Sequence, residues 1–451
     1  MNTIITEQLI EEQDRNDKIS NFFKKFNIGK ALVKADFYKI KGTKPIELLK
    51  YLFALVFTNK NIYRDITTHP QAGKSKNTIY RFLNSTLYDW SKLLFQIAMS
   101  VIAFILPLTS EKRENVLIAD DTLYSRSRSK KVDMLTRVYD HTTCKYVKGF
   151  KLLTLAWSDG NTTIPVRFRH LVSTNEKMII NPLPENVDKR TRSYKLRRSA
   201  QSNPIEALNE LIKSVDLAAM KVKYILFDSW FAFPSTIMDI CKRKVNVICR
   251  LKKMYRVYYT YNGKRYNLSR LFEVVPHHRH KDIIASVNVK IHNADNEEMN
   301  AKIIFLSTNN GKDWIALLST DTALSDEEII RIYGKRWNIE VMFKTSKSFL
   351  HLDTELQSLR FESLYAHTAI VYLRYIMLAY ESRVSQDNRT CGELFFIICD
   401  ELKDISYLEA LTILLTCFIN AAKDQLILTE EQISCLIGIF MAQIPRCFKK
   451  C

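Results

Sequence analysis

The sequence predicts a mixed α/β protein, in which an α/β core interrupted by a β-rich segment is flanked by helical N- and C-terminal regions. Helical segments fill residues 1–110, and an apolar helical region returns over 350–451. Between them, short apolar runs alternate with helical segments over 115–250, and β-rich runs with hairpin turns fill 251–320. Strands that alternate with helices are typical of an α/β sheet.

The composition is that of a globular and strongly basic chain. It has 451 residues, 47% of them hydrophobic, and a formal net charge of +19. This excess of positive charge favours a polyanionic partner, with nucleic acid first. The longest apolar runs, 97–108 and 433–442, are shorter than the ~20 residues that a membrane span needs, so no membrane partner is expected. The most cationic stretch, 189–198, is predicted to lie in a loop.

The cysteines and the N-terminus favour a reducing compartment. Nine cysteines are scattered without a C-x-x-C pair, which favours neither a disulfide framework nor a zinc site. The first twenty residues are polar and acidic, so no signal peptide is predicted there. We therefore expect a cytoplasmic protein.

The helical region 1–110 is the expected DNA-end-binding region. Residues 45–57 predict one helix with Pro45 in its first turn, and 76–84 with 87–106 predict a turn and further helices. A basic helix in an all-helical region is compatible with a DNA-reading unit and equally with plain helical packing.

Two apolar runs of the α/β region end in aspartate. "NVLIAD" ends at Asp120, and "KYILFD" ends at Asp228. Side chains at the carboxyl ends of adjacent strands in an α/β sheet converge on one site. Taken singly, Asp120 is equally compatible with a turn after the strand, and Asp228 with a loop or a helix cap.

The segment "YGKRWNIEVMFKTSK", residues 333–347, contains a third carboxylate among cations. The capping-box spacing of Ser325 and Glu328 predicts the start of its helix. At about 100° per residue, one arc of roughly 60° on a single helix carries four side chains: Tyr333, Arg336, Glu340 and Lys347. Either this is a solvated face with an Arg336–Glu340 ion pair, or the glutamate binds a cation and its neighbours bind an anion.

Three clustered carboxylates need a cation between them. Such oxygen ligands suit Mg²⁺ or Mn²⁺, and two of these ions about 4 Å apart activate a nucleophile and stabilise the leaving oxygen in phosphoryl transfer. We therefore predict that Asp120, Asp228 and Glu340 are catalytic ligands of two Mg²⁺ (or Mn²⁺) ions. The DNA backbone would be contacted by the three neighbours of Glu340: Tyr333, Arg336 and Lys347.

These residues resemble those of the DDE transposases of bacterial insertion sequences. The Y-x2-R-x3-E-x6-K pattern of the insertion-sequence-four family, its Y-R-E-K signature, is matched in full within 333–347. "LIADDT" and "ILFDSWF" resemble the two aspartate blocks of that family. The resemblance covers residues 115–375 and is weak to absent outside them.

The resemblance implies an RNase H-like catalytic core, in two parts at 111–250 and 321–375, interrupted by a β-rich insertion at 251–320. It implies a homodimer that brings two transposon ends together, with the terminal inverted repeats and the target as double-stranded DNA partners. It also implies cut-and-paste chemistry, in which water cuts the element's end and the freed 3′-hydroxyl attacks target DNA. The helical region 376–451 is then a candidate for dimerisation.

Two residue assignments stay open. The family pattern D-x-T favours Asp120 over Asp121 as the first ligand, and because side chains alternate along a strand, only one of the two can be a ligand. The resemblance also implies that Trp314, in the final strand of the insertion, binds DNA by stacking on an extruded base. The alternative is that Trp314 is a core residue.

Two other functions share parts of this pattern. An RNase H-like nuclease without strand transfer would keep the carboxylates but would not prefer inverted repeats. A non-catalytic DNA-binding protein derived from a transposase would be expected to lose one of the acidic residues, and all three are present.

Overall fold

The computed structural model describes residues 18–399 except for short gaps, and one residue beyond them. The gaps are at 59, 69–74, 111–112, 141–142, 185–186, 279, 309–312, 385–390 and 392, and residue 432 is described alone. Most of the expected dimerisation region, 376–451, therefore lies outside the described residues.

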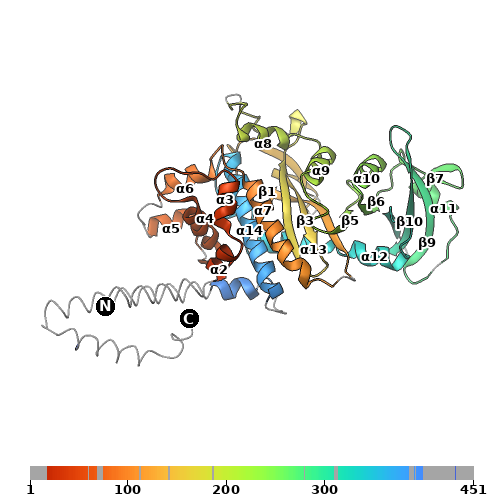
Figure 1. The fold of residues 1–451 in the computed structure, drawn as a ribbon. Coiled ribbons are helices and arrows are strands. Elements are labelled where there is room, and N and C mark those ends of the chain that lie inside the picture. The colour runs from red at the N-terminus through yellow and green to blue at the C-terminus, as the bar shows by residue number, and fades with distance from the viewer. Residues whose placement is uncertain are drawn as a thin grey trace.

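Helices make up the N-terminal part of the described chain. They are α2 (Lys18–Lys25), α3 (Ile28–Lys34), α4 (Pro45–Ala54), α5 (Ile62–Thr68), α6 (Lys76–Leu83) and α7 (Trp90–Ile105), with 3₁₀ helices η1 (Leu55–Thr58) and η2 (Leu106–Leu108). Ser75 and Asp89 cap α6 and α7 by accepting hydrogen bonds from backbone N–H groups of the first turn. α4, α6 and α7 contact α14 (Phe361–Val384), and Figure 1 shows this helical layer beside the sheet.

The middle strands of the sheet have the RNase H-like order β4-β3-β1-β5-β6. Their bounds are β1 (Asn115–Ser125), β3 (Lys145–Ser158), β4 (Thr163–Leu171), β5 (Val222–Phe227) and β6 (Asn246–Leu251). β1, β3 and β4 are antiparallel to one another in turn, whereas β5 runs parallel to β1 and β6 parallel to β5. β2 (Thr136–Asp140) pairs with the first half of β3. The mixed α/β fold with an RNase H-like core is thus confirmed.

The β-rich insertion continues the same sheet. β11 (Asp313–Ser319) pairs with β6, and β10 (Glu298–Thr308), β9 (Ile283–His292), β7 (Tyr258–Tyr261) and β8 (Lys264–Asn267) follow in that order. The Asn262-Gly263 turn between β7 and β8 has φ values of 48° and 76°, as a two-residue hairpin turn with positive φ at both positions requires. Figure 1 shows these strands and α11 (Leu268–Val274) at the end of the molecule opposite the N-terminal helices.

Helices cover both faces of the core strands. On one face lie α7, α14 and α13 (Trp337–Ser348), and Thr154 of β3 hydrogen-bonds Tyr372 of α14 at 2.7 Å. α9 (Pro204–Lys213) contacts β3 and β4, and the indole of Trp157 donates to the carbonyl of Met220 at 3.0 Å. Because Thr154 and Trp157 are three residues apart on one strand, they point to opposite faces. α10 (Pro234–Cys241) and α12 (Asp326–Gly334) contact β6.

One described helix is long and apolar enough to cross a membrane by length and composition alone. It is α7 with the 3₁₀ turn that follows it, Trp90–Leu108, 19 residues. α7 contacts β4 and α14, and its side chains Leu94, Ile97 and Val101 are buried. These are the contacts of a helix that packs on a sheet.

The prediction of a loop at 189–198 was wrong. Helix α8 (Arg192–Ala200) occupies most of this stretch, with the Thr191 side chain as its N-cap. Lys and Arg are good helix formers, and burial of Arg197 against two carboxylates, Asp133 at 2.9 Å and Glu362 at 2.8 Å, holds the helix in place.

Candidate active site

Asp120 and Asp228 lie side by side where two parallel strands part. β1 pairs with β5 up to Ala119 and Phe227, and each aspartate is the next residue of its chain segment. Asp228 directly follows β5, as expected. Asp120 does not end its strand, because β1 stays paired with β3 as far as Ser125.

Asp120 and Asp121 point to opposite faces of the sheet. The carboxylate of Asp120 accepts a hydrogen bond from Arg336, with 2.7 Å between Oδ2 and Nη1. The carboxylate of Asp121 accepts one from Lys151 of β3 at 3.3 Å. This is the alternation expected along a strand, and it puts Asp120 on the face where α13 carries Glu340.

The four residues of the Y-x2-R-x3-E-x6-K pattern are divided among α12, the turn that follows it and α13, so the prediction of one continuous helix was wrong. α12 ends at Gly334 and α13 begins at Trp337. Between them, the N–H groups of Lys335 and Arg336 donate to carbonyls three residues back, at 3.1 and 2.9 Å. Such a 3₁₀ turn advances by a larger angle per residue, and Gly334, a poor helix former, precedes it. The arc of roughly 60° calculated for a straight helix therefore does not describe this face.

The guanidinium of Arg336 joins two of the three predicted carboxylates. It donates from Nη1 to Asp120 at 2.7 Å and from Nη2 to Glu340 at 2.5 Å. The Arg336 and Glu340 side chains are 17% and 34% exposed, so their pair is partly buried. Asp228 interacts electrostatically with both Asp120 and Arg336. The structure thus joins Asp120 and Glu340 through one guanidinium, and Asp228 lies beside Asp120 at the ends of the paired segments of β1 and β5.

The charges at this place are not fully compensated. Burial raises the pKa of Asp120 to about 7 against the opposing effect of Arg336, and repulsion from Asp121 and Asp228 adds to the rise. The Oδ1 atom of Asp228 is buried and has no hydrogen-bond partner. A buried carboxylate oxygen of this kind is costly unless a cation or a donor meets it.

The donor set fits a divalent cation in its chemistry. Its members are hard carboxylate oxygens, one of them unpaired, as Mg²⁺ and Mn²⁺ prefer. Among the residues that the structure describes, no group of three or more His, Cys, Asp or Glu side chains lies close enough to form a ready metal site. Arg336 instead supplies the positive charge between Asp120 and Glu340.

We expect the metal-free protein to lose stability as the pH rises towards about 7. The folded state raises the pKa of Asp120 from 3.8 to about 7. The stabilisation that this shift gives to the folded state is fully present below pH 3.8 and is lost as the pH rises through about 7. Asp120→Asn removes this titration, so the free energy of unfolding of the variant should fall less between pH 5 and pH 8. Urea denaturation of the wild type and of Asp120→Asn in EDTA measures the free energy of unfolding at each pH. An equal decrease in both proteins would contradict the prediction.

Lys347 and Tyr333 contact the same region from the two helices. The ammonium of Lys347 donates to the hydroxyl of Thr122 at 2.8 Å, and burial lowers the pKa of Lys347. The hydroxyl of Tyr333 is buried without a hydrogen-bond partner. Burial raises the pKa of Tyr333, with Arg336 opposing and Asp228 adding to the rise. Both side chains are partly buried and carry donors beside the carboxylates.

Trp314 packs within the insertion. Its ring stacks on Phe272 with centroids 4.5 Å apart and meets the edge of Phe305 at 5.3 Å. The ammonium of Lys253 lies 4.1 Å from the ring centroid. The half-buried indole is thus part of an aromatic cluster of the insertion, and one cation covers it.

A second tryptophan, which was not among the predicted site residues, follows Asp228 within the block "ILFDSWF". Trp230 lies two residues after Asp228 and is 48% exposed. Its position after an aspartate block was visible in the sequence, but its exposure and its neighbours were not.

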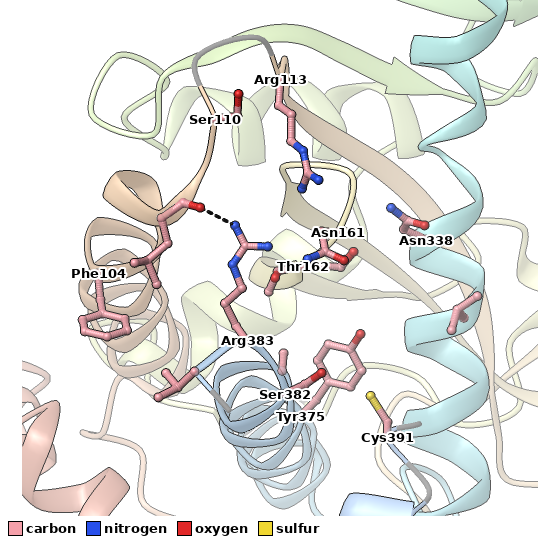
Figure 2. A pocket seen from close by; sticks show the side chains of 15 residues that line it. Phe104, Ser110, Arg113, Asn161, Thr162, Asn338, Tyr375, Ser382, Arg383 and Cys391 are labelled. Atoms are coloured by element: carbon pink, nitrogen blue, oxygen red, sulfur yellow. Dashed lines mark hydrogen bonds between the residues drawn. The ribbon is translucent and has the colours of Figure 1, made fainter. Parts of the chain in front are cut away.

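A separate cavity of about 790 Å³ lies beside the start of α13. Figure 2 shows Arg113 and Arg383 reaching into it together with Asn161 and Asn338, and Arg383 donating to a main-chain carbonyl of η2. Arg383 also pairs with the buried carboxylate of Asp159 at 3.1 Å, so its charge is compensated. The cavity adjoins the β3–β4 turn, which lies next to the start of β1. Asp120 lies further along the same strand.

Two family models match the sequence. The family described as DDE superfamily endonuclease matches residues 46–266, which include Asp120 and Asp228. The family described as transposase DDE domain matches residues 186–374, which include Asp228 and Glu340. These two matches support a DDE transposase. Enzymes of the DDE superfamily generally depend on divalent metal ions and act on DNA.

Other comparisons add little to the two family matches. No curated protein matches the chain. Among solved structures, the chain is similar to the NurA nuclease from Sulfolobus solfataricus, at 11% identity over 55% of this chain and 88% of that one. The TM-score is 0.25, and so low a value supports no conclusion about the site.

Proposed function

We propose that the chain is a transposase of the insertion-sequence-four family, which cuts the ends of its element and joins them to target DNA by a cut-and-paste route. The observation that carries the proposal is the Arg336 guanidinium that bridges Asp120 and Glu340, with Asp228 next to Asp120 where β1 and β5 part. The net charge of +19 supports a DNA partner, and the complete Y-x2-R-x3-E-x6-K pattern supports the family.

In this proposal Asp120, Asp228 and Glu340 hold two Mg²⁺ or Mn²⁺ ions. Bound there, the ions would supply an activated water and stabilise the leaving oxygen. The unpaired Oδ1 of Asp228 is available as a ligand. Arg336 keeps two of the carboxylates together in the metal-free protein, and its remaining N–H groups are donors for a DNA phosphate.

The other predicted contacts have distinct roles in the proposal. Tyr333 and Lys347 donate to the DNA backbone beside the carboxylates, where the buried Tyr333 hydroxyl and the Lys347 ammonium lie. Trp314 and Lys253 contact DNA from the insertion. A homodimer holds the two inverted-repeat ends and the double-stranded target, and the protein acts in the cytoplasm.

The test is a cleavage and joining assay. The substrate is a duplex that carries the inverted repeats flanking the gene, with Mg²⁺ and a supercoiled target plasmid. We expect cuts at the repeat ends and covalent joining of the freed 3′-hydroxyl to the plasmid, and we expect Glu340→Gln to bind the duplex but leave it uncut.

The alternatives predict different products. Cleavage without joining, and without preference for the repeats, would show that the protein is a nuclease that lacks strand transfer. DNA binding without any cleavage in Mg²⁺ or Mn²⁺ would replace it with a non-catalytic DNA-binding protein.

A further inference from the structure

An exposed tryptophan lies at the sheet edge that carries the candidate carboxylates. Trp230 follows β5 two residues after Asp228 and is 48% exposed, whereas its neighbour Phe231 is 1% exposed and belongs to the core. About half of the indole surface is therefore open to solvent and accessible to a ligand.

Two lysines hold their ammonium groups over this indole. Lys151 of β3 lies 5.1 Å from the ring centroid, and Lys252, directly after β6, lies 5.6 Å from it. Lys252 is exposed. The three side chains come from three different segments of one sheet, so their convergence on a single ring is a property of the fold.

The tryptophan and its lysines border the candidate carboxylates. Lys151 is the ion-pair partner of Asp121 at 3.3 Å, and Asp121 is next to Asp120 on β1, about 3.8 Å away between Cα atoms. Asp120 faces Arg336 and Asp121 faces Lys151. Arg336 with Asp120 therefore lies on one face of the sheet, and Lys151 with the Trp230 cluster lies on the other face, at the same level of β1.

We propose that Trp230, Lys151 and Lys252 form a subsite for an unpaired nucleotide at the border of the candidate site, on the face of the sheet opposite Arg336. The indole stacks on the nucleobase, and the two ammonium groups contact the phosphates on either side of it. Stacking on an aromatic ring tolerates every base, and lysines neutralise the backbone without reading sequence. The subsite therefore favours a frayed or single-stranded DNA end over a fully paired one, without preference for a base. Its position relative to the cut rests on the proposed function, whereas its binding of an unpaired nucleotide does not.

The test measures binding without metal, so that it does not depend on cleavage. The probe is a duplex of the repeat end with a short single-stranded tail that carries 2-aminopurine, whose fluorescence is quenched on stacking. In EDTA we expect quenching by the wild type and by Trp230→Phe. Trp230→Ala should lose the quenching and bind the tailed probe about 5- to 150-fold more weakly, the range for loss of one stacked base. Its affinity for a blunt duplex should change little.

Two further variants make the test specific. Lys252→Gln should lower the slope of log affinity against log salt by about 1, as loss of one phosphate contact predicts. Tyr255→Ala is the matched control, because Tyr255 is also an exposed ring (70% exposed) with a cation, Arg256, 5.0 Å from its centroid. Equal losses in Tyr255→Ala and Trp230→Ala would overturn the subsite, because they would show a general surface effect.

The outcome separates this inference from the proposed function. If the wild type cuts and joins DNA in Mg²⁺ while Trp230→Ala keeps full quenching and affinity, the subsite is overturned and the transposase proposal stands. If the wild type never cuts but its quenching depends on Trp230, the subsite stands as a binding site and the transposase proposal fails.

Discussion

Replacement of Asp120 by asparagine should reduce DNA cleavage at the repeat ends by at least about a thousandfold. A metal ligand supports several kcal/mol of transition-state stabilisation, and each 1.36 kcal/mol is a factor of ten in rate. Asparagine keeps the size of the side chain and removes its charge. Single-turnover cleavage of a labelled repeat duplex in Mg²⁺ measures the rate, and binding in EDTA should stay within a few-fold.

Asp121→Asn is the matched control for this experiment. The two residues are adjacent on β1, but the Asp121 carboxylate is on the other face and pairs with Lys151. We expect Asp121→Asn to slow cleavage by less than about tenfold, since a partly exposed ion pair contributes little. If Asp121→Asn slowed cleavage a thousandfold and Asp120→Asn had only a small effect, Asp121 and not Asp120 would be the metal ligand.

Removal of the Arg374 side chain should lower the free energy of unfolding by about 3–5 kcal/mol, as for other broken buried ion pairs. Arg374 of α14 is 1% exposed and donates to both carboxylate oxygens of Glu355, which is 7% exposed, at 2.6 and 2.9 Å. It also donates to the main-chain carbonyls of Leu52 and Phe53 at 2.5 and 3.0 Å. One side chain thus connects the N-terminal helices, α14 and the segment that follows α13.

Urea denaturation of Arg374→Ala at pH 7 measures this loss. The control is the double variant Arg374→Met with Glu355→Leu, which leaves no unpaired charge and should recover part of the stability. A loss below about 1 kcal/mol in the single variant, the size of a surface ion pair, would show that the network does not hold these segments together.

The same network should resist acid. Burial raises the pKa of Glu355, but the opposing effect of Arg374 and His367 is larger. Together they bring this pKa to about 2, below its ordinary value of 4.5. Its contribution to stability is therefore present above pH 4.5 and is lost as the pH falls towards 2. Arg374→Ala should make the protein unfold at a higher pH on acidification, as a circular dichroism titration would show.

Local chain chemistry was enough to predict many elements. The cap at Ser325 with Glu328 is present as a capping box, and the turn at Asn262-Gly263 joins two short antiparallel strands. These features depend on residues a few positions apart, so the sequence contains all the information that they need. The loop predicted at 189–198 failed because the burial of Arg197 against distant carboxylates is not visible locally.

The sequence by itself determined the types of the elements, the two aspartate blocks and the pattern that includes Glu340. Only the tertiary structure decided which aspartate of β1 faces α13, that Arg336 reaches Asp120 across 216 residues of chain, and that Trp230 is exposed between two lysines. Periodicity relates side chains within one element. The meeting of different elements depends on strand order and on the helices that pack across the sheet, and these are set by the burial of the whole core.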